Sequence, residues 1–386
     1  MFRRFVFAAL SAMTMLSLAA CSSTPSDVKA TEEDDNNMTL SGSSNKERLF
    51  NYITEIYDTG KTISGQMDLT WAPGVDMAQT VYEDTGRYPA IMGYDFMNYT
   101  CSYNNTDQTN EALSWWKDAK GTGKHGIVTF CWHWRNPLNP DKRESSSDDN
   151  FYTKGTSFRI PFENGKLNES SEAFVAIKKD LDTVAKELTI LKNAGVPVLW
   201  RPLHEASGGW FWWGASGKDA YIALYRYMYD YFTQEKGLDN LIWVWNGQSA
   251  QWYPGDSYCD VISWDEYDSS KFDADYKALV EMDTDKVIAL SENGPIPKEP
   301  YGMNCNWAWF MTWNDSGDAG NDNEDGASGA TKSSILFRTA RKSTTTTMFA
   351  LWMSCLTLHR LSNFRKAPDS FASGAFCRET VIYSIS

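Results

Sequence analysis

The chain has 386 residues and a formal net charge of −14, from 50 acidic and 36 basic side chains. This length can bury a full hydrophobic core, either as one large α/β barrel or as two ordinary domains. The acidic balance argues against a nucleic-acid partner, whose phosphates need a basic surface, and it fits a neutral substrate.

The N-terminus has the features of an export signal. Phe2-Arg3-Arg4 supplies positive charge, residues 5–20 form an apolar run, and Leu18-Ala19-Ala20-Cys21 closes it. This ending resembles a bacterial lipobox, whose cysteine is acylated, although an ordinary cleaved signal beside a cysteine is the alternative. We expect residues 1–21 to be a lipoprotein signal peptide with Cys21 lipidated. Its two or three acyl chains would anchor an exported protein to a membrane, at the cell surface or in the periplasm.

Residues 22–45 are rich in Ser, Thr, Asp, Glu and Asn, which predicts a flexible linker. A helix is expected from Lys46, with Leu49, Ile53 and Ile56 along one face. Eight apolar, strand-like runs follow, separated by helical patterns: 62–67, 90–96, 126–132, 197–203, 241–245, 261–264, 286–290 and 307–313.

The segments between these runs include three clear amphipathic patterns, at residues 109–120, 171–194 and 219–234. Repeated strand–helix units predict parallel pairing with right-handed crossovers. Eight such units favour a (β/α)8 barrel in the α/β class, with residues 46–314 as a single catalytic domain and the expected state a monomer.

Two further segments lack helical or strand periodicity. Residues 136–166 are long and polar, and we interpret them as a loop that shapes one end of a groove. Residues 315–386 form an atypical C-terminal tail with an Asp/Gly/Asn-rich start and a threonine run, so this tail is either divergent or out of frame.

The motifs of cofactor and metal sites are missing from the sequence. The cysteines form no C-x-x-C pair, so we expect most of them to be free and buried. No dinucleotide-binding glycine motif or P-loop is present, and no third ligand accompanies His133 and His204. We therefore expect no cofactor and no metal.

Polar and aromatic residues gather directly after the strand-like runs, at the barrel end where such enzymes place their sites. The fourth run leads into PVLWRPLHEASGGWFWWG at residues 197–214, where Glu205 precedes a cluster of indole rings. Such rings stack on the C–H faces of sugars, and they raise the pKa of a carboxyl that they shield. Glu292 ends the seventh run in the same way, and two carboxyls across a barrel mouth suit glycoside hydrolysis.

These motifs resemble the signature of glycoside hydrolase family 26, the β-mannanases. The resemblance rests on RPLHEASGGWFWWG at residues 201–214 and ALSENGP at 289–295, and it extends over about residues 45–314. It implies a retaining mechanism with Glu205 as general acid/base and Glu292 as nucleophile. It also implies that the substrate-binding residues include His133, His204, Trp210, Asp265, Tyr267 and Trp313. Arg201 joins this set on a physical argument, since it and the Tyr267 hydroxyl would hold Glu292 ionised.

Three functions remain open from the sequence. The first is an endo-acting β-1,4-mannanase acting on mannan, glucomannan or galactomannan. The second applies the same chemistry to mixed-linkage β-glucan or β-1,3-xylan. The third is a surface glycan-binding lipoprotein without turnover, against which the presence of both glutamates argues. Among Trp210, Trp212 and Trp213, we expect one or two to pack in the core.

Overall fold

The structure is a computed structural model, and it describes residues 44–70, 75–102, 107–118, 121–297, 305–313 and 382–383. The predicted signal peptide with Cys21 and the linker up to residue 43 lie outside these ranges. So do Asn314 and all of the C-terminal tail except residues 382–383.

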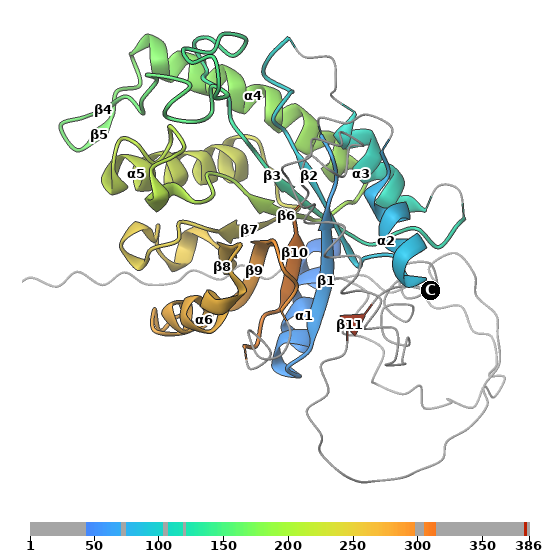
Figure 1. The fold of residues 1–386 in the computed structure, drawn as a ribbon. Helices are drawn as coiled ribbons and strands as arrows, with labels where there is room; N and C mark the ends of the chain where they lie inside the picture. The colour runs from blue at the N-terminus through green and yellow to red at the C-terminus, as the bar shows by residue number, and fades with distance from the viewer. Residues whose placement is uncertain are drawn as a thin grey trace, which may run out of the picture. The chain divides into compact units, whose positions relative to one another are not determined.

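Eight parallel strands form a closed barrel, as the sequence predicts (Figure 1). The order around the barrel follows the chain, and β10 pairs with β1, where Ile63 lies opposite Trp309. A two-residue strand, β11 (Ile382–Tyr383), also pairs with β1 in parallel. The barrel strands are β1 (Thr62–Met67), β2 (Ile91–Asp95), β3 (Ile127–Cys131), β6 (Val198–Arg201), β7 (Leu241–Trp245), β8 (Val261–Glu266), β9 (Val287–Asn293) and β10 (Trp309–Thr312).

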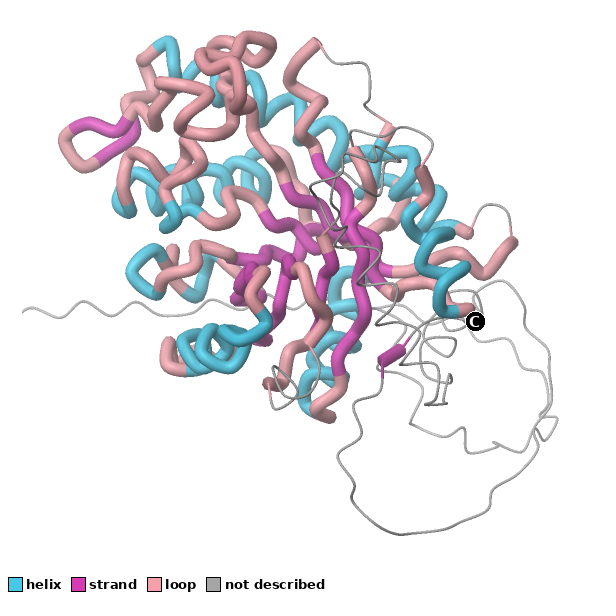
Figure 2. Tube along the Cα trace, in the orientation of Figure 1, coloured by secondary structure: helices cyan, strands magenta, loops and turns pink. Residues whose placement is uncertain are grey.

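Helices surround these strands (Figures 1 and 2). The three helices predicted between the strands are present as α3, α4 and α5, and α5 continues into one π-helical turn at Tyr231–Glu235. Two shorter helices, α2 and α6, were not predicted. The outer helices are α2 (Met77–Thr85), α3 (Gln108–Lys117), α4 (Glu172–Asn193), α5 (Lys218–Asp230) and α6 (Phe272–Val280).

The first helix, α1 (Asn45–Asp58), lies across one end of the barrel interior. Ser44 caps it, accepting a hydrogen bond from the Glu47 amide while the Glu47 side chain accepts one from the Ser44 amide. Its apolar face, Leu49 and Ile53 included, packs in one cluster with side chains of the barrel interior. Since α1 leads directly into β1, the end that it covers is the amino-terminal one, and the site is left to the carboxyl ends of the strands.

Glycine gives the barrel interior room for methionine side chains. A Cβ atom on Gly93 of β2 would lie 2.0 Å from the Met67 sulfur of β1. That is far inside van der Waals contact, so a larger residue at position 93 requires the Met67 side chain to move. Glycine at this position therefore leaves the space that Met67 fills in the barrel interior.

The connection from β3 to α4 covers residues 132–171, and Figure 2 shows it mostly as loop. Its only strands are the short antiparallel pair β4 (Phe162–Glu163) and β5 (Lys166–Leu167). The Asn150 side chain, which is fully buried, donates to the carbonyl oxygens of Asn139, Pro140 and Lys142 at 2.9, 2.9 and 3.1 Å. Hydrogen bonds within the predicted loop therefore stabilise its conformation.

The prediction that most cysteines are free and buried can be compared with the described residues. Cys131 and Cys259 are buried free thiols, Cys305 is a free thiol that is partly exposed, and Cys101 is partly exposed. Within the ranges that the structure describes, none of the helices combines the length and apolar character that crossing a bilayer requires.

Candidate active site

Glu205 and Glu292 lie together at the carboxyl end of the barrel. Glu205 follows β6, the fourth barrel strand, and Glu292 lies in β9, the seventh. A carboxylate oxygen of each lies within 4.8 Å of one of the other, and both residues are buried. This short separation favours the geometry of retaining glycosidases, whose carboxyls are about 5–5.5 Å apart, over the wider gap that inversion needs.

The surroundings of Glu205 favour its protonated form. Burial raises the pKa of Glu205 well above its ordinary value, and the negative charges of Glu292 and Asp265 raise it further. The indole Nε1 of Trp210 donates to Glu205 Oε2 at 2.7 Å, which opposes this shift. The backbone of Glu205 is left-handed, with φ at 53°, and its amide is held by Asn246. Such a conformation is unfavourable for a residue with a side chain, and it is common at functional sites.

The surroundings of Glu292 suit a charged carboxylate instead. Arg201 Nη2 donates to Oε2 at 2.6 Å, and the Tyr267 hydroxyl donates to Oε1 at 2.6 Å. Burial raises the pKa of the Tyr267 phenol well above its ordinary value, so it remains a donor. Both oxygens of Glu292 are thereby fixed in direction, and the carboxylate is oriented as a nucleophile must be.

Arg201 is shared between two carboxylates. Its Nη1 donates to Asp265 Oδ2 at 2.5 Å, while Asn246 Nδ2 and Ser291 Oγ donate to Asp265 Oδ1 at 2.7 and 2.8 Å. Burial alone would lower the pKa of the Arg201 guanidinium, but the charges of Asp265 and Glu292 raise it. The network joins β6, β7, β8 and β9 beneath Glu205 and Glu292. Neither Asn246 nor Ser291 was assigned a role from the sequence, although Asn246 is one of the polar residues that directly follow the strand-like runs.

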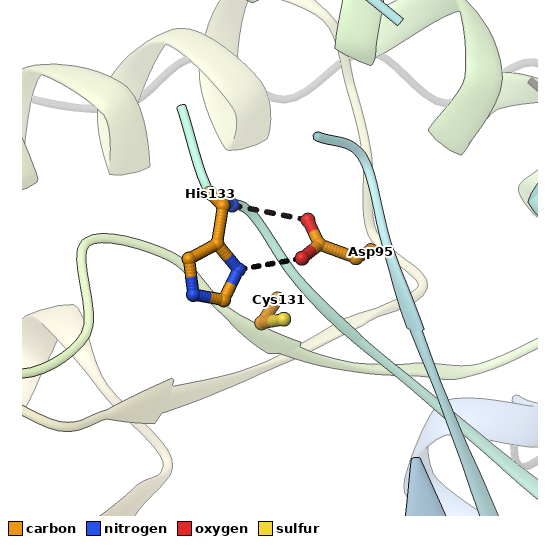
Figure 3. Close-up of side chains that lie close together, drawn as sticks. All are labelled: Asp95, Cys131 and His133. Atoms are coloured by element: carbon orange, nitrogen blue, oxygen red, sulfur yellow. Dashed lines mark hydrogen bonds and ion pairs between the residues drawn. The ribbon is translucent and has the colours of Figure 1, made fainter. Parts of the chain in front are cut away.

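His133 and His204 also meet, as Nε2 of one lies 3.3 Å from Nε2 of the other. His133 Nδ1 faces Asp95 Oδ2 at 2.5 Å, and Cys131 lies beside this pair (Figure 3). Donor atoms of Asp95, Cys131 and His133 lie within 4.8 Å of one another. Burial raises the pKa of the Cys131 thiol well above its ordinary value, and Nδ1 of the imidazole is already engaged. These residues therefore fit a hydrogen-bonded unit better than a metal site, which needs a thiolate and a bare nitrogen.

The three tryptophans of the fourth-strand motif divide as predicted. Trp212 and Trp213 are fully buried, and their indole nitrogens donate to the carbonyl oxygens of Trp134 and His204 at 2.6 and 2.8 Å. Trp210 is 43% exposed, and Tyr267 is 49% exposed. Two large half-exposed rings, each hydrogen-bonded to one of the two glutamates, are surfaces on which sugar rings stack.

Trp313 lies at the end of β10, and its ring centroid is 5.5 Å from that of His133. The structure thus brings all nine predicted site residues of the barrel to its carboxyl end.

The sequence predicts that the β3–α4 loop shapes the groove, but it does not identify Tyr152 within that loop. Tyr152 forms an isolated antiparallel bridge with Phe211, and their rings stack with centroids 5.3 Å apart and an interplanar angle of 12°. Burial raises the pKa of the Tyr152 phenol, and the negative charges of Glu205 and Glu292 raise it further. Nothing in the aperiodic sequence around Tyr152 signals this placement.

Known proteins resemble this chain over most of the described residues. The mannan endo-1,4-beta-mannosidase of Thermothelomyces thermophilus is 37% identical over 275 residues, which cover 69% of this chain and 55% of that one. Mannan endo-1,4-beta-mannosidase B of a Piromyces species is 35% identical over 239 residues, covering 60% of this chain and 39% of that one. This chain therefore spans about half or less of the length of these two relatives.

Solved structures of similar fold include the GH26-CBM35 β-(1,4)-mannanase of Podospora anserina. It has a TM-score of 0.65 and 32% identity, and the match covers 79% of this chain and 66% of that one. The β-mannanase from a symbiotic protist of the termite Reticulitermes speratus, complexed with gluco-manno-oligosaccharide, has a TM-score of 0.62 and 30% identity over 79% of this chain and 93% of that one. The model of glycosyl hydrolase family 26 matches residues 39–337, and the chain belongs to that family.

Proposed function

We propose that this protein is a retaining, endo-acting glycoside hydrolase that cleaves β-1,4-mannosidic bonds. The observation that carries the proposal is the pair of buried glutamates whose carboxylate oxygens come within 4.8 Å at the barrel mouth. One of them is biased toward its protonated form, while the other accepts hydrogen bonds from a guanidinium and a phenol. Two carboxyls in opposite protonation states are what double displacement at a sugar requires.

In the proposed mechanism, Glu292 attacks the anomeric carbon while Glu205 donates its proton to the departing sugar oxygen. A covalent glycosyl-enzyme results, with its ester bond at Glu292. Glu205, now a carboxylate, removes a proton from water, which attacks the anomeric carbon and releases Glu292. Arg201 and Tyr267 hold the nucleophile, and Asp265 holds Arg201. We assign substrate contacts to the remaining predicted residues, His133, His204, Trp210 and Trp313.

The choice of mannan as substrate is supported by the names of the relatives, which are mannan endo-1,4-beta-mannosidases. The test is to incubate the purified full chain with mannan, glucomannan, lichenan and β-1,3-xylan, and to separate the products by size over time. We expect a ladder of manno-oligosaccharides and an early fall in viscosity, with the β-anomer formed first. Preferred cleavage of lichenan or β-1,3-xylan would reassign the substrate, and an initial α-anomer would contradict retention.

A Trp210→Phe variant should shift the alkaline limb of the kcat/KM profile to higher pH. The indole N–H stabilises the Glu205 carboxylate, so its removal raises the pKa of this acid and keeps it protonated further into alkali. The shift should be about 0.5–1 pH unit, because a hydrogen bond to a charged group contributes about 1.5–3 kcal/mol when fully shielded and Trp210 is half-exposed.

The measurement is kcat/KM on mannohexaose from pH 5 to pH 10 for both proteins. An aryl mannobioside with a dinitrophenol leaving group is the internal control, since its leaving group needs little protonation. The kcat/KM profile measured with this substrate should therefore show almost no alkaline limb. A shift of the limb to lower pH would contradict the assigned role of Trp210.

We further propose that the protein is exported and anchored to a membrane through acylation of Cys21. The support is the sequence alone, in which Leu18-Ala19-Ala20-Cys21 follows an apolar run. A Cys21→Ala variant expressed in a bacterial host should move from the membrane fraction to the soluble fraction, because the acyl chains supply the affinity. Cys305→Ala is the matched control and should stay with the membranes. Membrane partitioning of Cys21→Ala would refute the anchor.

A further inference from the structure

Three buried polar side chains at the ends of three neighbouring strands are linked in a row by hydrogen bonds. Asp95 ends β2, His133 follows β3 and His204 follows β6, with exposed fractions of 1%, 6% and 1%. Asp95 Oδ2 lies 2.5 Å from His133 Nδ1, and His133 Nε2 lies 3.3 Å from His204 Nε2. Figure 3 shows the first of these links. Of the three, Asp95 has no role in the mechanism described above.

The Asp95 carboxylate is fixed in direction. Its Oδ1 accepts hydrogen bonds from the backbone amides of His133 and Met97 at 3.0 and 2.9 Å, which leaves Oδ2 to face the imidazole. Burial opposes ionisation, but the neighbouring His133 and these hydrogen bonds lower the pKa of Asp95 overall. An ionised carboxylate can only accept, so the proton of the link must sit on Nδ1 of His133.

The second link of the row, between the two imidazole rings, constrains the protonation of His204. The hydrogen bond between the two Nε2 atoms needs a proton on one of them and a bare nitrogen on the other. Burial and the charge of Arg201 lower the pKa of His204 well below its ordinary value, so this second ring is neutral and carries a single proton. The tautomer that fits the Asp95 link puts this proton on His204 Nε2, which donates to a bare His133 Nε2 and leaves His204 Nδ1 bare.

An independent observation agrees with this tautomer. Nδ1 of His204 is buried and has no hydrogen-bond partner among the described residues. A buried acceptor without a partner is better tolerated than a buried N–H group without one. The rings of Phe151, Phe211 and Trp313 lie 5.2, 5.5 and 5.5 Å from the His133 ring and limit its rotation.

We propose that Asp95 is a positioning residue that fixes, through His133, the tautomers of both histidines. The hydrogen bond between the two rings then runs in one direction, from His204 Nε2 to His133 Nε2, and it fixes the ring that stands one residue before Glu205. The consequence for turnover rests on the function proposed above, whereas the tautomers do not.

The test is nuclear magnetic resonance of full-length protein labelled with 15N-histidine. Only four histidines are present, and single Gln substitutions at His125, His359 and His133 assign all four signals, with His204 left by elimination. Long-range proton–nitrogen correlations tell a protonated ring nitrogen from a bare one. We expect His133 protonated on Nδ1 and His204 on Nε2 at neutral pH. A wild-type spectrum with His204 protonated on Nδ1 overturns the proposal by itself.

Asp95→Asn then tests the consequence for turnover. The amide oxygen can keep the two backbone contacts, but the NH2 group replaces Oδ2 and makes His133 Nδ1 an acceptor, as an Asp-to-Asn change beside a catalytic histidine does elsewhere. Both tautomers should reverse, and kcat/KM on mannohexaose should fall roughly ten- to hundred-fold. Asp107→Asn, on the exposed start of α3, is the matched control.

These outcomes separate the two proposals. An inactive wild type with the expected tautomers contradicts the proposed function and leaves the role of Asp95 intact. An active Asp95→Asn enzyme with reversed tautomers and unchanged kcat/KM contradicts the positioning role. If Asp95→Asn does not fold, the wild-type spectrum still decides the tautomers.

Discussion

Replacing Glu292 by alanine is expected to abolish turnover on every substrate, natural or activated. Without this carboxylate no glycosyl-enzyme forms, and the remaining groups cannot offer another nucleophile in line with the anomeric carbon. The fall in kcat/KM should be roughly 10⁴- to 10⁶-fold, which is the scale found when an enzyme loses its nucleophile. Rates on mannohexaose and on a dinitrophenyl mannobioside, measured on the same preparations, give the result.

Loss of activity must be separated from loss of structure, because Glu292 accepts a hydrogen bond from buried Arg201. Asp265 remains as a partner of this guanidinium, so the variant should fold with reduced stability. Glu292→Gln keeps the shape of the side chain and should be as inactive as the alanine variant. Glu281→Ala, an exposed change at the far end of α6, is the control. Activity of Glu292→Gln within tenfold of wild type would remove Glu292 from the mechanism.

The sequence predicts the barrel because apolar runs and helical patterns alternate in it. The bounds of β1 and β7 agree with the predicted runs, and α4 begins at Glu172 after its Ser171 cap. The helices α2 and α6 were missed for a physical reason. Each has nine residues and buries only a few side chains, such as Met77 and Val81 in α2. Both helices are therefore too short to show a clear helical period in the sequence.

The sequence also predicts that Glu205 and Glu292 meet, since both end barrel strands and the fourth and seventh strands face each other across a closed barrel. What could not be predicted is the support beneath them. Asn246 and Ser291 look like ordinary strand-end polar residues, and only the three-dimensional register brings both to Asp265. The left-handed backbone of Glu205 carries no signal in the residue type, because glycine, not glutamate, favours that region.

The β3–α4 loop is the part of the site least accessible from sequence. Its length and polarity predict a loop, but its shape depends on Asn150 satisfying three carbonyl groups at once. That shape brings Tyr152 against Phe211, in the motif that carries Glu205. Contacts of this kind join residues far apart in the chain, and no local period records them.

Replacing Glu205 by alanine should give a different kinetic pattern from the loss of Glu292. On mannohexaose, kcat/KM should fall by about 10²- to 10⁴-fold, the usual contribution of general acid–base catalysis. On a dinitrophenyl mannobioside, kcat/KM should stay close to wild type because this leaving group departs without a proton. Its kcat should fall nonetheless, since water then attacks the glycosyl-enzyme without a base.

The two steps can be separated directly. A burst of dinitrophenol equal to the enzyme concentration should precede a slow steady rate, because the covalent intermediate accumulates. Azide, an anion that needs no base, should restore the steady rate and yield a β-mannosyl azide. The β configuration follows from two inversions, the first by Glu292 and the second by azide. If Glu205→Ala shows no burst and no azide product, Glu205 does not serve both steps. The assignment of Glu205 as general acid/base and Glu292 as nucleophile would then be wrong.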